Sequence, residues 1–178
     1  LIEALSITTG KKLWTYKTKG AIYSSPVISN QTVILGSGDG NIYALNVNSG
    51  KLVWKVKTPQ AVLGSPVLDN ENVLIGGSDN SFSAINIKTG KTVWSFTEVE
   101  GNIVGKPLIY QGKVIFGSWG RHLYALDLKT GGLIWKWNNG SQNRMFSPAM
   151  CTPVATNGIV YIAAPDRFLT AINASDGK

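Results

Sequence analysis

The sequence of 178 residues contains one cysteine, Cys151, and one histidine, His122. A single cysteine excludes an internal disulfide framework and a metal site built from several thiolates. A single histidine excludes a metal cluster or a histidine-paired nucleophile that needs a second histidine. We therefore predict no catalytic residue and no metal ligand, and we expect the Cys151 thiol to be inert.

Charged residues and long apolar runs are also scarce. Charged residues make up 15% of the chain and apolar residues 43%, a balance that excludes a disordered chain. No apolar run approaches the roughly 18 to 20 residues that cross a bilayer, so no transmembrane segment is predicted. No basic start followed by an apolar stretch indicates a signal peptide. Because the first residue is Leu1 rather than methionine, we expect that any leader was removed or lies outside this segment.

Helical periodicity is missing as well, because no window places apolar residues at i, i+3, i+4 and i+7. What the sequence does have is glycine and tryptophan at regular intervals. Each of four segments begins with alanine, has glycine at its seventh position and ends with tryptophan; they are residues 4–14, 44–54, 84–94 and 125–135. A fifth copy, residues 171–178, stops before its tryptophan position. The alanines are 40, 40, 41 and 46 residues apart, which indicates a repeat array.

Each repeat contains four short runs rich in β-branched and aromatic residues. In the first complete repeat the runs are residues 26–28, 32–35, 41–47 and 51–56, and turn sequences with glycine or asparagine separate them. Four antiparallel strands per repeat predict an all-β fold, namely a β-propeller of four-stranded antiparallel blades. We label the strands of a blade A to D from the centre of the propeller outward.

The motif Ala-[Leu/Ile]-[Asn/Asp]-x-x-[Thr/Ser]-Gly-[Lys/Gly]-x-x-Trp resembles the tryptophan-docking repeat of the PQQ-like, or quinoprotein, β-propellers. The Gly-His and Trp-Asp pairs of the WD40 repeat do not occur. The resemblance implies that the tryptophan packs against the alanine and glycine of its motif and against the neighbouring blade. It therefore assigns a structural role to these residues: Trp14, Trp54, Trp94, Trp135, Gly10, Gly50, Gly90 and Gly131.

The repeat boundaries divide residues 1–178, a single propeller segment, into about four blades. We expect a partial blade at 1–19, blades at about 20–59, 60–100 and 101–138, and an incomplete blade at 147–178. Relatives of the resembled family usually have eight blades, so we expect this segment to belong to an eight-bladed ring whose remaining blades, or a second domain, lie outside it. The alternative is a small ring in which residues 12–16 complete the last blade, which leaves the strand at 4–7 redundant.

The length differences between repeats fall on one connection. The proline that opens each repeat precedes the motif alanine by 18 residues in every case: Pro26, Pro66, Pro107 and Pro153. Only the step from tryptophan to the next proline varies, and it reaches 18 residues after Trp135. The expanded segment, residues 138–152, joins strand D to the next strand A. Loops on a rigid scaffold often carry function, so this connection is a candidate for a binding loop.

The arginines indicate the same face of the propeller. Strand directions place the D–A connections and the B–C turns on one face, and the C–D turns, which carry Lys11, Lys51, Lys91 and Lys129, on the other. We predict a site for a protein partner or a small anionic ligand on the first face, made by Arg121, His122, Trp119, Arg144, Asp166 and Arg167. The alternative is that the arginines pair with nearby carboxylates, such as that of Asp166, and with carbonyl groups, and that His122 is structural.

The remaining features favour binding over catalysis. The net charge is +7, but the lysines are scattered without a basic run, so we predict no nucleic-acid partner. The resembled family includes enzymes with a quinone cofactor and Ca²⁺, but no Cys-Cys pair occurs here. We expect no cofactor, and PQQ with Ca²⁺ only if the chain is a fragment of a PQQ-dependent dehydrogenase.

We therefore predict a non-catalytic, BamB-like binding or scaffold domain of an exported protein. One alternative is the accessory domain of a larger exported enzyme, such as a metallophosphoesterase, and the other is the dehydrogenase fragment. The resemblance implies a periplasmic or cell-surface location.

Overall fold

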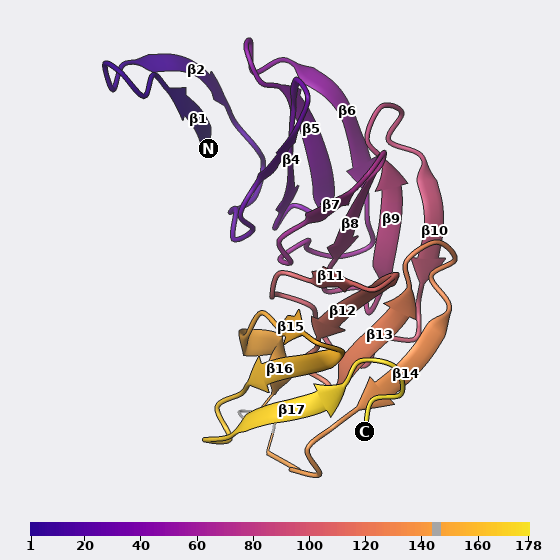
Figure 1. The fold of residues 1–178 in the computed structure, drawn as a ribbon. Coiled ribbons are helices and arrows are strands. Elements are labelled where there is room, and N and C mark those ends of the chain that lie inside the picture. The colour runs from indigo at the N-terminus through magenta and orange to yellow at the C-terminus, as the bar shows by residue number, and fades with distance from the viewer. Residues whose placement is uncertain (144–146) are drawn as a thin grey trace.

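The computed structural model describes residues 1–143 and 147–178, and these residues form five antiparallel β-sheets in chain order (Figure 1). The first sheet has two strands, β1 (Ile2–Leu5) and β2 (Lys12–Tyr16). The second sheet has four strands: β3 (Val27–Ser29), β4 (Thr32–Ser37), β5 (Asn41–Asn46) and β6 (Leu52–Lys57). The third sheet also has four: β7 (Val67–Asp69), β8 (Asn72–Gly76), β9 (Phe82–Asn86) and β10 (Thr92–Phe96). The fourth sheet has β11 (Leu108–Tyr110), β12 (Lys113–Gly117), β13 (Leu123–Asp127) and β14 (Leu133–Trp137). The last sheet has three strands: β15 (Val154–Thr156), β16 (Ile159–Ala163) and β17 (Leu169–Asn173).

The five sheets follow one another along an arc (Figure 1). Within each sheet the spatial order of the strands equals their order in the chain. Strand β7 contacts both β3 and β11, so the first strands of neighbouring sheets approach one another where the sheets converge. This radial arrangement of up-and-down sheets is that of β-propeller blades, and it confirms the all-β propeller class predicted from the repeat.

The hydrophobic core lies between the sheets, and the three four-stranded sheets each have two buried faces. Val33 and Leu35 of β4 pack towards Trp14 and Tyr16 of the first sheet. The intervening residue, Ile34, packs on the opposite face, against the sheet β7–β10. The alternation follows from the period of two in a β-strand. It explains why the strands have nearly continuous apolar runs instead of an alternation of apolar and polar residues.

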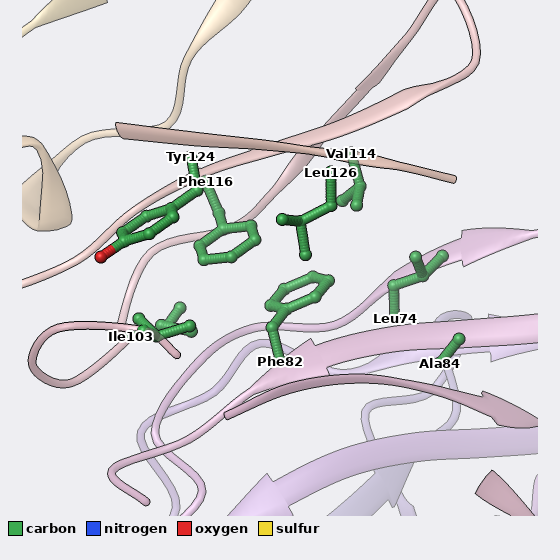
Figure 2. Close-up of a cluster of buried hydrophobic side chains, with 9 residues drawn as sticks. Leu74, Phe82, Ala84, Ile103, Val114, Phe116, Tyr124 and Leu126 are labelled. Carbon is green, nitrogen blue, oxygen red and sulfur yellow. The ribbon is translucent and has the colours of Figure 1, made fainter. Parts of the chain in front are cut away.

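The interface between β7–β10 and β11–β14 shows how such a contact is filled (Figure 2). Phe82 and Phe116 stack face to face with ring centroids 4.1 Å apart, and Tyr124 stacks beside Phe116 at 5.5 Å. Ile103, from the connection between β10 and β11, belongs to the same cluster. The aromatic side chains occupy the wedge between two twisted sheets.

The tryptophan at the end of each motif contacts the following blade. Its indole N–H donates a hydrogen bond to a main-chain carbonyl of that blade in every case: Trp14 to Val47, Trp54 to Ile87, Trp94 to Leu128 and Trp135 to Ala174. The tryptophan pairs with the alanine of its own motif, and the register shifts next to this pair. In β5 and β6, for example, the shift lies between Ala44↔Trp54 and Leu45↔Leu52. This bulge leaves Val53 without a cross-strand partner.

The motif glycine leaves room for the indole of the preceding blade. Gly50 has φ +66°, and a Cβ atom built on it would lie 2.6 Å from Cε3 of Trp14. A larger residue would therefore be strained by its backbone and would collide with the ring. Glycine at this place serves both the tight C–D turn and the contact between blades.

Candidate functional site

The D–A connections and B–C turns lie on one face of the sheets, which we call the loop face. The connections β6–β7 and β10–β11 are each held between two B–C turns by main-chain hydrogen bonds. For the connection between β10 and β11, the Trp119 amide donates to the Asn102 carbonyl at 2.9 Å, and the Ile103 amide donates to the Gly77 carbonyl at 3.1 Å. Neighbouring turns on this face are thus fixed relative to one another.

Four residues occupy the same position in the B–C turns, four residues before the motif alanine. All four have positive φ: Gly40 at 73°, Asn80 at 60°, Arg121 at 71° and Arg167 at 73°. Glycine and asparagine tolerate this left-handed conformation, whereas a longer side chain in it costs about 1–2 kcal/mol. Arginine at this position in two turns therefore carries a local cost in stability.

The first of these arginines is used within the chain. Nη1 of Arg121 donates to the Ser141 carbonyl at 2.8 Å and to Oε1 of Gln142 at 2.7 Å. Arg121 thereby anchors the start of the expanded D–A connection to the B–C turn of β12 and β13. The alternative of pairing with local carbonyl groups is confirmed for this arginine.

The second arginine is in a different situation. The Asp166 carboxylate accepts hydrogen bonds from Nδ2 of Asn139 at 2.7 Å and from the Phe168 amide at 3.0 Å. The guanidinium group of Arg167 makes no hydrogen bond or ion pair with any residue in the described ranges. Among the described residues, Asp166, the example of a nearby carboxylate in the alternative interpretation, accepts from Asn139 and the Phe168 amide instead. Beside Arg167, the phenyl ring of Phe168 is 70% exposed.

Two shallow clefts meet at the anchored connection. The first has a volume of about 400 Å³ and is lined by Glu100, Gly101, Trp119, Gly120 and Arg121. The second has a volume of about 470 Å³ and is lined by Asn139, Gly140, Ser141, Asp166, Phe168 and Thr170. Because Arg121 lines one cleft and its acceptor Ser141 lines the other, the start of the connection separates them. The structure thus places Trp119 and Arg121 in one cleft and Asp166 in the adjacent one, and Arg167 follows Asp166 in the same B–C turn.

His122 belongs to a supporting cluster behind this surface. Its side chain is 12% exposed, Nδ1 lies 3.6 Å from Oε2 of Glu100, and Nε2 lies 3.1 Å from Nδ2 of Asn138. Burial, followed by the charge of Lys136, lowers the pKa of His122 below its ordinary value, although Glu100 opposes the shift. Glu100 also forms an ion pair with Lys136, whose ammonium group lies 5.6 Å from the centre of the Tyr124 ring. His122 is therefore neutral at pH 7 and faces other protein groups.

Two further sequence candidates have different outcomes. Arg144 lies outside the described residues. The Cys151 thiol is half-buried, and burial together with the charge of Asp166 raises its pKa, so the thiolate is not favoured at neutral pH. The end of the expanded connection is part of the core: Ser147, Pro148 and Ala149 are buried, and η2 (Pro148–Met150) packs against β12. Residues 147–149 of the expanded connection thus serve the scaffold.

Sequence reasoning missed Phe168, Asn139 and Gln142. A signal for Phe168 was present, because the other repeats have Asn41, Ser81 and His122 at the same position, three residues before the motif alanine. An exposed aromatic residue replaces polar ones only in the last repeat. Asn139 and Gln142 had no such signal, because they belong to a connection without a counterpart in the other repeats.

The charged groups do not gather into a metal centre. Among residues 1–143 and 147–178, no three His, Cys, Asp or Glu side chains come together in a set that could hold a metal ion. Within the same residues, no helix is long and apolar enough to cross a membrane.

Comparisons with known proteins agree with the repeat and the fold. The sequence family described as outer membrane protein assembly factor BamB matches residues 1–145. No curated protein sequence matches the chain. Among solved structures, BamB from Moraxella catarrhalis is similar with a TM-score of 0.77 and 23% identity, over 95% of this chain and 52% of BamB. The chain thus spans about half the length of that protein.

Two other structures extend the comparison. A computationally designed protein, Ika4, has a TM-score of 0.76 and 20% identity over 93% of this chain and 99% of the design. Quinohemoprotein alcohol dehydrogenase from Comamonas testosteroni has a TM-score of 0.83 and 16% identity over 99% of this chain and 39% of the enzyme. At these identities the similarity shows a shared fold.

Proposed function

Because the chain belongs to the family of the outer membrane protein assembly factor BamB, we propose that it is a non-catalytic propeller segment that binds a protein partner through the loop face. The partner surface we propose presents a carboxylate to Arg167 and an apolar group to Phe168. In keeping with the family, we place this activity in the assembly of outer membrane proteins, on the periplasmic side of the membrane.

The observation that carries the proposal is the pair formed by Arg167 and Phe168. Arg167, whose guanidinium group has no hydrogen-bond or ion-pair partner among residues 1–143 and 147–178, stands in a left-handed backbone position beside a phenyl ring that is 70% exposed. Both side chains are exposed, and the arginine costs stability at a position where other turns have Gly40 and Asn80. Arginine and aromatic residues are enriched at the energetic centres of protein interfaces, which supports a binding role for this turn.

The rigidity of the loop face supports the same proposal. The hydrogen bonds of Arg121 to Ser141 and Gln142, and of Asn139 to Asp166, tie the connection to two successive B–C turns. A partner would therefore meet a surface whose parts are already positioned, and binding would cost little ordering entropy.

Site-specific crosslinking in cells tests the proposal. A photoreactive amino acid at position 167 or 168 should give a discrete crosslinked species with an outer membrane assembly protein, whereas the same probe at Lys51 or Lys91, on the opposite face, should not. Arg167→Asn should reduce this crosslink from position 168 by about tenfold, the loss expected for one charged contact.

The stability of Arg167→Asn shows whether a weaker crosslink comes from lost binding or from lost folding. Arg167→Asn should unfold at the same or a slightly higher urea concentration, because asparagine already occupies the matching position at residue 80. Equal crosslinking from the two faces would contradict the proposal. Binding of an isolated anion, lost in Arg167→Asn without any protein crosslink, would replace it with a small-ligand function.

A further inference from the structure

The residue before the motif alanine differs between otherwise similar blades. It is Tyr43 in the sheet β3–β6 and Tyr124 in the sheet β11–β14, but Ser83 in the sheet β7–β10 between them. Both tyrosines face the preceding sheet, where Tyr43 packs edge-on against Tyr16 at 5.6 Å and Tyr124 packs against Phe96 at 6.2 Å. The middle sheet thus lacks a ring that both its neighbours have.

A cleft occupies the corresponding place. It lies between the sheets β3–β6 and β7–β10, has a volume of about 200 Å³, and has Val56, Ile75 and Ile85 among its lining residues. Ser83 and Ser95 line one side and share a hydrogen bond of 2.9 Å. Cavities of about 150 Å³ lined by apolar side chains bind a benzene ring, so this cleft is large enough for one aromatic ring.

The polar group that accompanies the tyrosine is still present. In the sheet β3–β6, Oδ2 of Asp39 accepts hydrogen bonds from the Tyr43 hydroxyl at 2.8 Å and from the Lys19 amide at 2.9 Å. Asp79 holds the same position in the next repeat and lines the cleft. Its Oδ1 accepts from the amide and the hydroxyl of Ser81, as Oδ1 of Asp39 does from Asn41.

The other oxygen of Asp79 has lost both of its counterpart donors. Ser83 replaces the tyrosine, and Pro59, which has no amide hydrogen, replaces Lys19. None of the described residues donates a hydrogen bond to Oδ2 of Asp79. A space for a ring, lined in part by Val56, Ile75 and Ile85, and an unused carboxylate acceptor therefore occur together. In the sheet β3–β6 the same two positions hold Tyr43 and Asp39, which are hydrogen-bonded to each other.

We propose that this cleft is a binding site for a small phenol. The ring would lie between Val56 and Ile75, in the place of the tyrosine ring, and the phenolic hydroxyl would donate to Oδ2 of Asp79. A carboxylate beside the ring disfavours anionic ligands and favours a neutral hydrogen-bond donor. The inference is independent of the loop face and of any partner bound there.

The test uses p-cresol, which is the tyrosine side chain without its main chain, and the full chain. In a nuclear magnetic resonance titration, p-cresol should bind saturably and give nuclear Overhauser effects to the methyl groups of Val56 and Ile75. Toluene, which has the same ring and methyl group but no hydroxyl, should bind at least about tenfold more weakly, since it cannot donate to Asp79.

A variant that fills the cleft provides the second arm. Ser83→Tyr should abolish p-cresol binding and raise the melting temperature, because the new ring takes the place that Tyr43 and Tyr124 occupy in their sheets. Lys129→Tyr adds a tyrosine to an exposed turn of another sheet and should leave the affinity unchanged.

Three results would overturn the proposal: no saturable p-cresol binding, an equal affinity for toluene, or an unchanged affinity in Ser83→Tyr. If Ser83→Tyr does not fold, the Overhauser contacts of the wild-type protein decide, and contacts to methyl groups outside the cleft would refute the site.

Discussion

Single residues of this chain are tuned by the turn in which they lie, and Asp39 is an example. Burial alone would raise the pKa of its carboxyl group, but hydrogen bonds from Asn41, Tyr43 and the Lys19 amide outweigh that effect and lower the pKa to about 2. Its partner Tyr43 has a pKa raised to about 12, by burial and by the hydrogen bond to Asp39. Each group thus favours the protonation state that keeps the pair intact.

Because of this pair, the free energy of unfolding should decrease measurably at alkaline pH. The pKa of Tyr43 is higher in the folded chain than its ordinary value of 10, so its stabilisation is complete below pH 10 and is lost as the pH rises towards 12. In Tyr43→Phe, urea unfolding from pH 8 to 12 should show a stability loss relative to wild type that shrinks above pH 10. A difference that stays constant to pH 12 would contradict this, and Tyr23→Phe, at an exposed residue, is the control.

At acid pH the contribution of Asp39 to the free energy of unfolding is lost as the pH falls, whereas that of Tyr43 is lost as the pH rises. The folded pKa of Asp39 is below its ordinary value of 3.8, so its contribution is present above that pH and is lost as the pH falls towards 2. Tyr43→Phe should reduce this loss of stability at acid pH without abolishing it, because Asn41 and the Lys19 amide still donate to the carboxylate.

At the scale of the strand and its motif, the tryptophan links one blade to the next. Trp54→Phe removes the indole N–H and leaves the Ile87 carbonyl without its 2.7 Å donor. We expect a loss of about 1–3 kcal/mol in the free energy of unfolding, from the unsatisfied carbonyl and the smaller ring. Equilibrium denaturation in urea measures it.

Trp119→Phe is the matched control, because the Trp119 indole makes no hydrogen bond to the described residues and lines the cleft on the loop face. This change should cost less than about 0.5 kcal/mol. Equal losses in the two variants would show that the hydrogen bond between blades contributes nothing specific.

Much at this scale could be predicted from the sequence. The spacing of alanine, glycine and tryptophan, with turn residues between short apolar runs, predicted the strands that the structure contains, with ends that differ by one or two residues. The bulge beside each motif tryptophan was not predicted, because it depends on how the C–D turn joins the pleated backbones of strands C and D. The arginines at positions 121 and 167 were found by comparing repeats, and Phe168 could have been found in the same way.

Other parts of the sites depend on tertiary contacts that no repeat comparison contains. The acceptors of Arg121 lie in a connection with no counterpart, and within the described residues Asp166 accepts from Asn139 and the Phe168 amide rather than from Arg167. The cleft beside Ser83 requires two substitutions in separate parts of the repeat to be seen together, at residues 59 and 83.

At the scale of the whole molecule, both ends of the arc have apolar residues at positions that interior sheets bury. Leu5 is 58% exposed, whereas the residues at the same motif position, Leu45, Ile85 and Leu126, are at most 1% exposed. Leu169 is 70% exposed, whereas its counterparts Ile42, Phe82 and Leu123 are at most 2% exposed. The two end faces are therefore shaped to be covered by another sheet.

We predict that the polypeptide of residues 1–178 associates with itself through these end faces in a concentration-dependent manner. Leu5→Lys combined with Leu169→Lys should keep it monomeric in sedimentation velocity experiments. Leu133→Lys, at an exposed position on the outer strand β14, should not change the association. A double variant that still associates like the wild type would place the contact elsewhere on the molecule.

The alternation of side chains between two clusters also determines how substitutions combine. Val33 and Ile34 are neighbours in the chain, but they pack in different interfaces, whereas Ile34 and Val73, 39 positions apart, pack in the same one. The effects of changing Val33 and Ile34 should therefore add almost independently, while those of Ile34 and Val73 should not. A lineage could thus remodel one interface without disturbing the next, provided that its compensating changes came about one repeat apart.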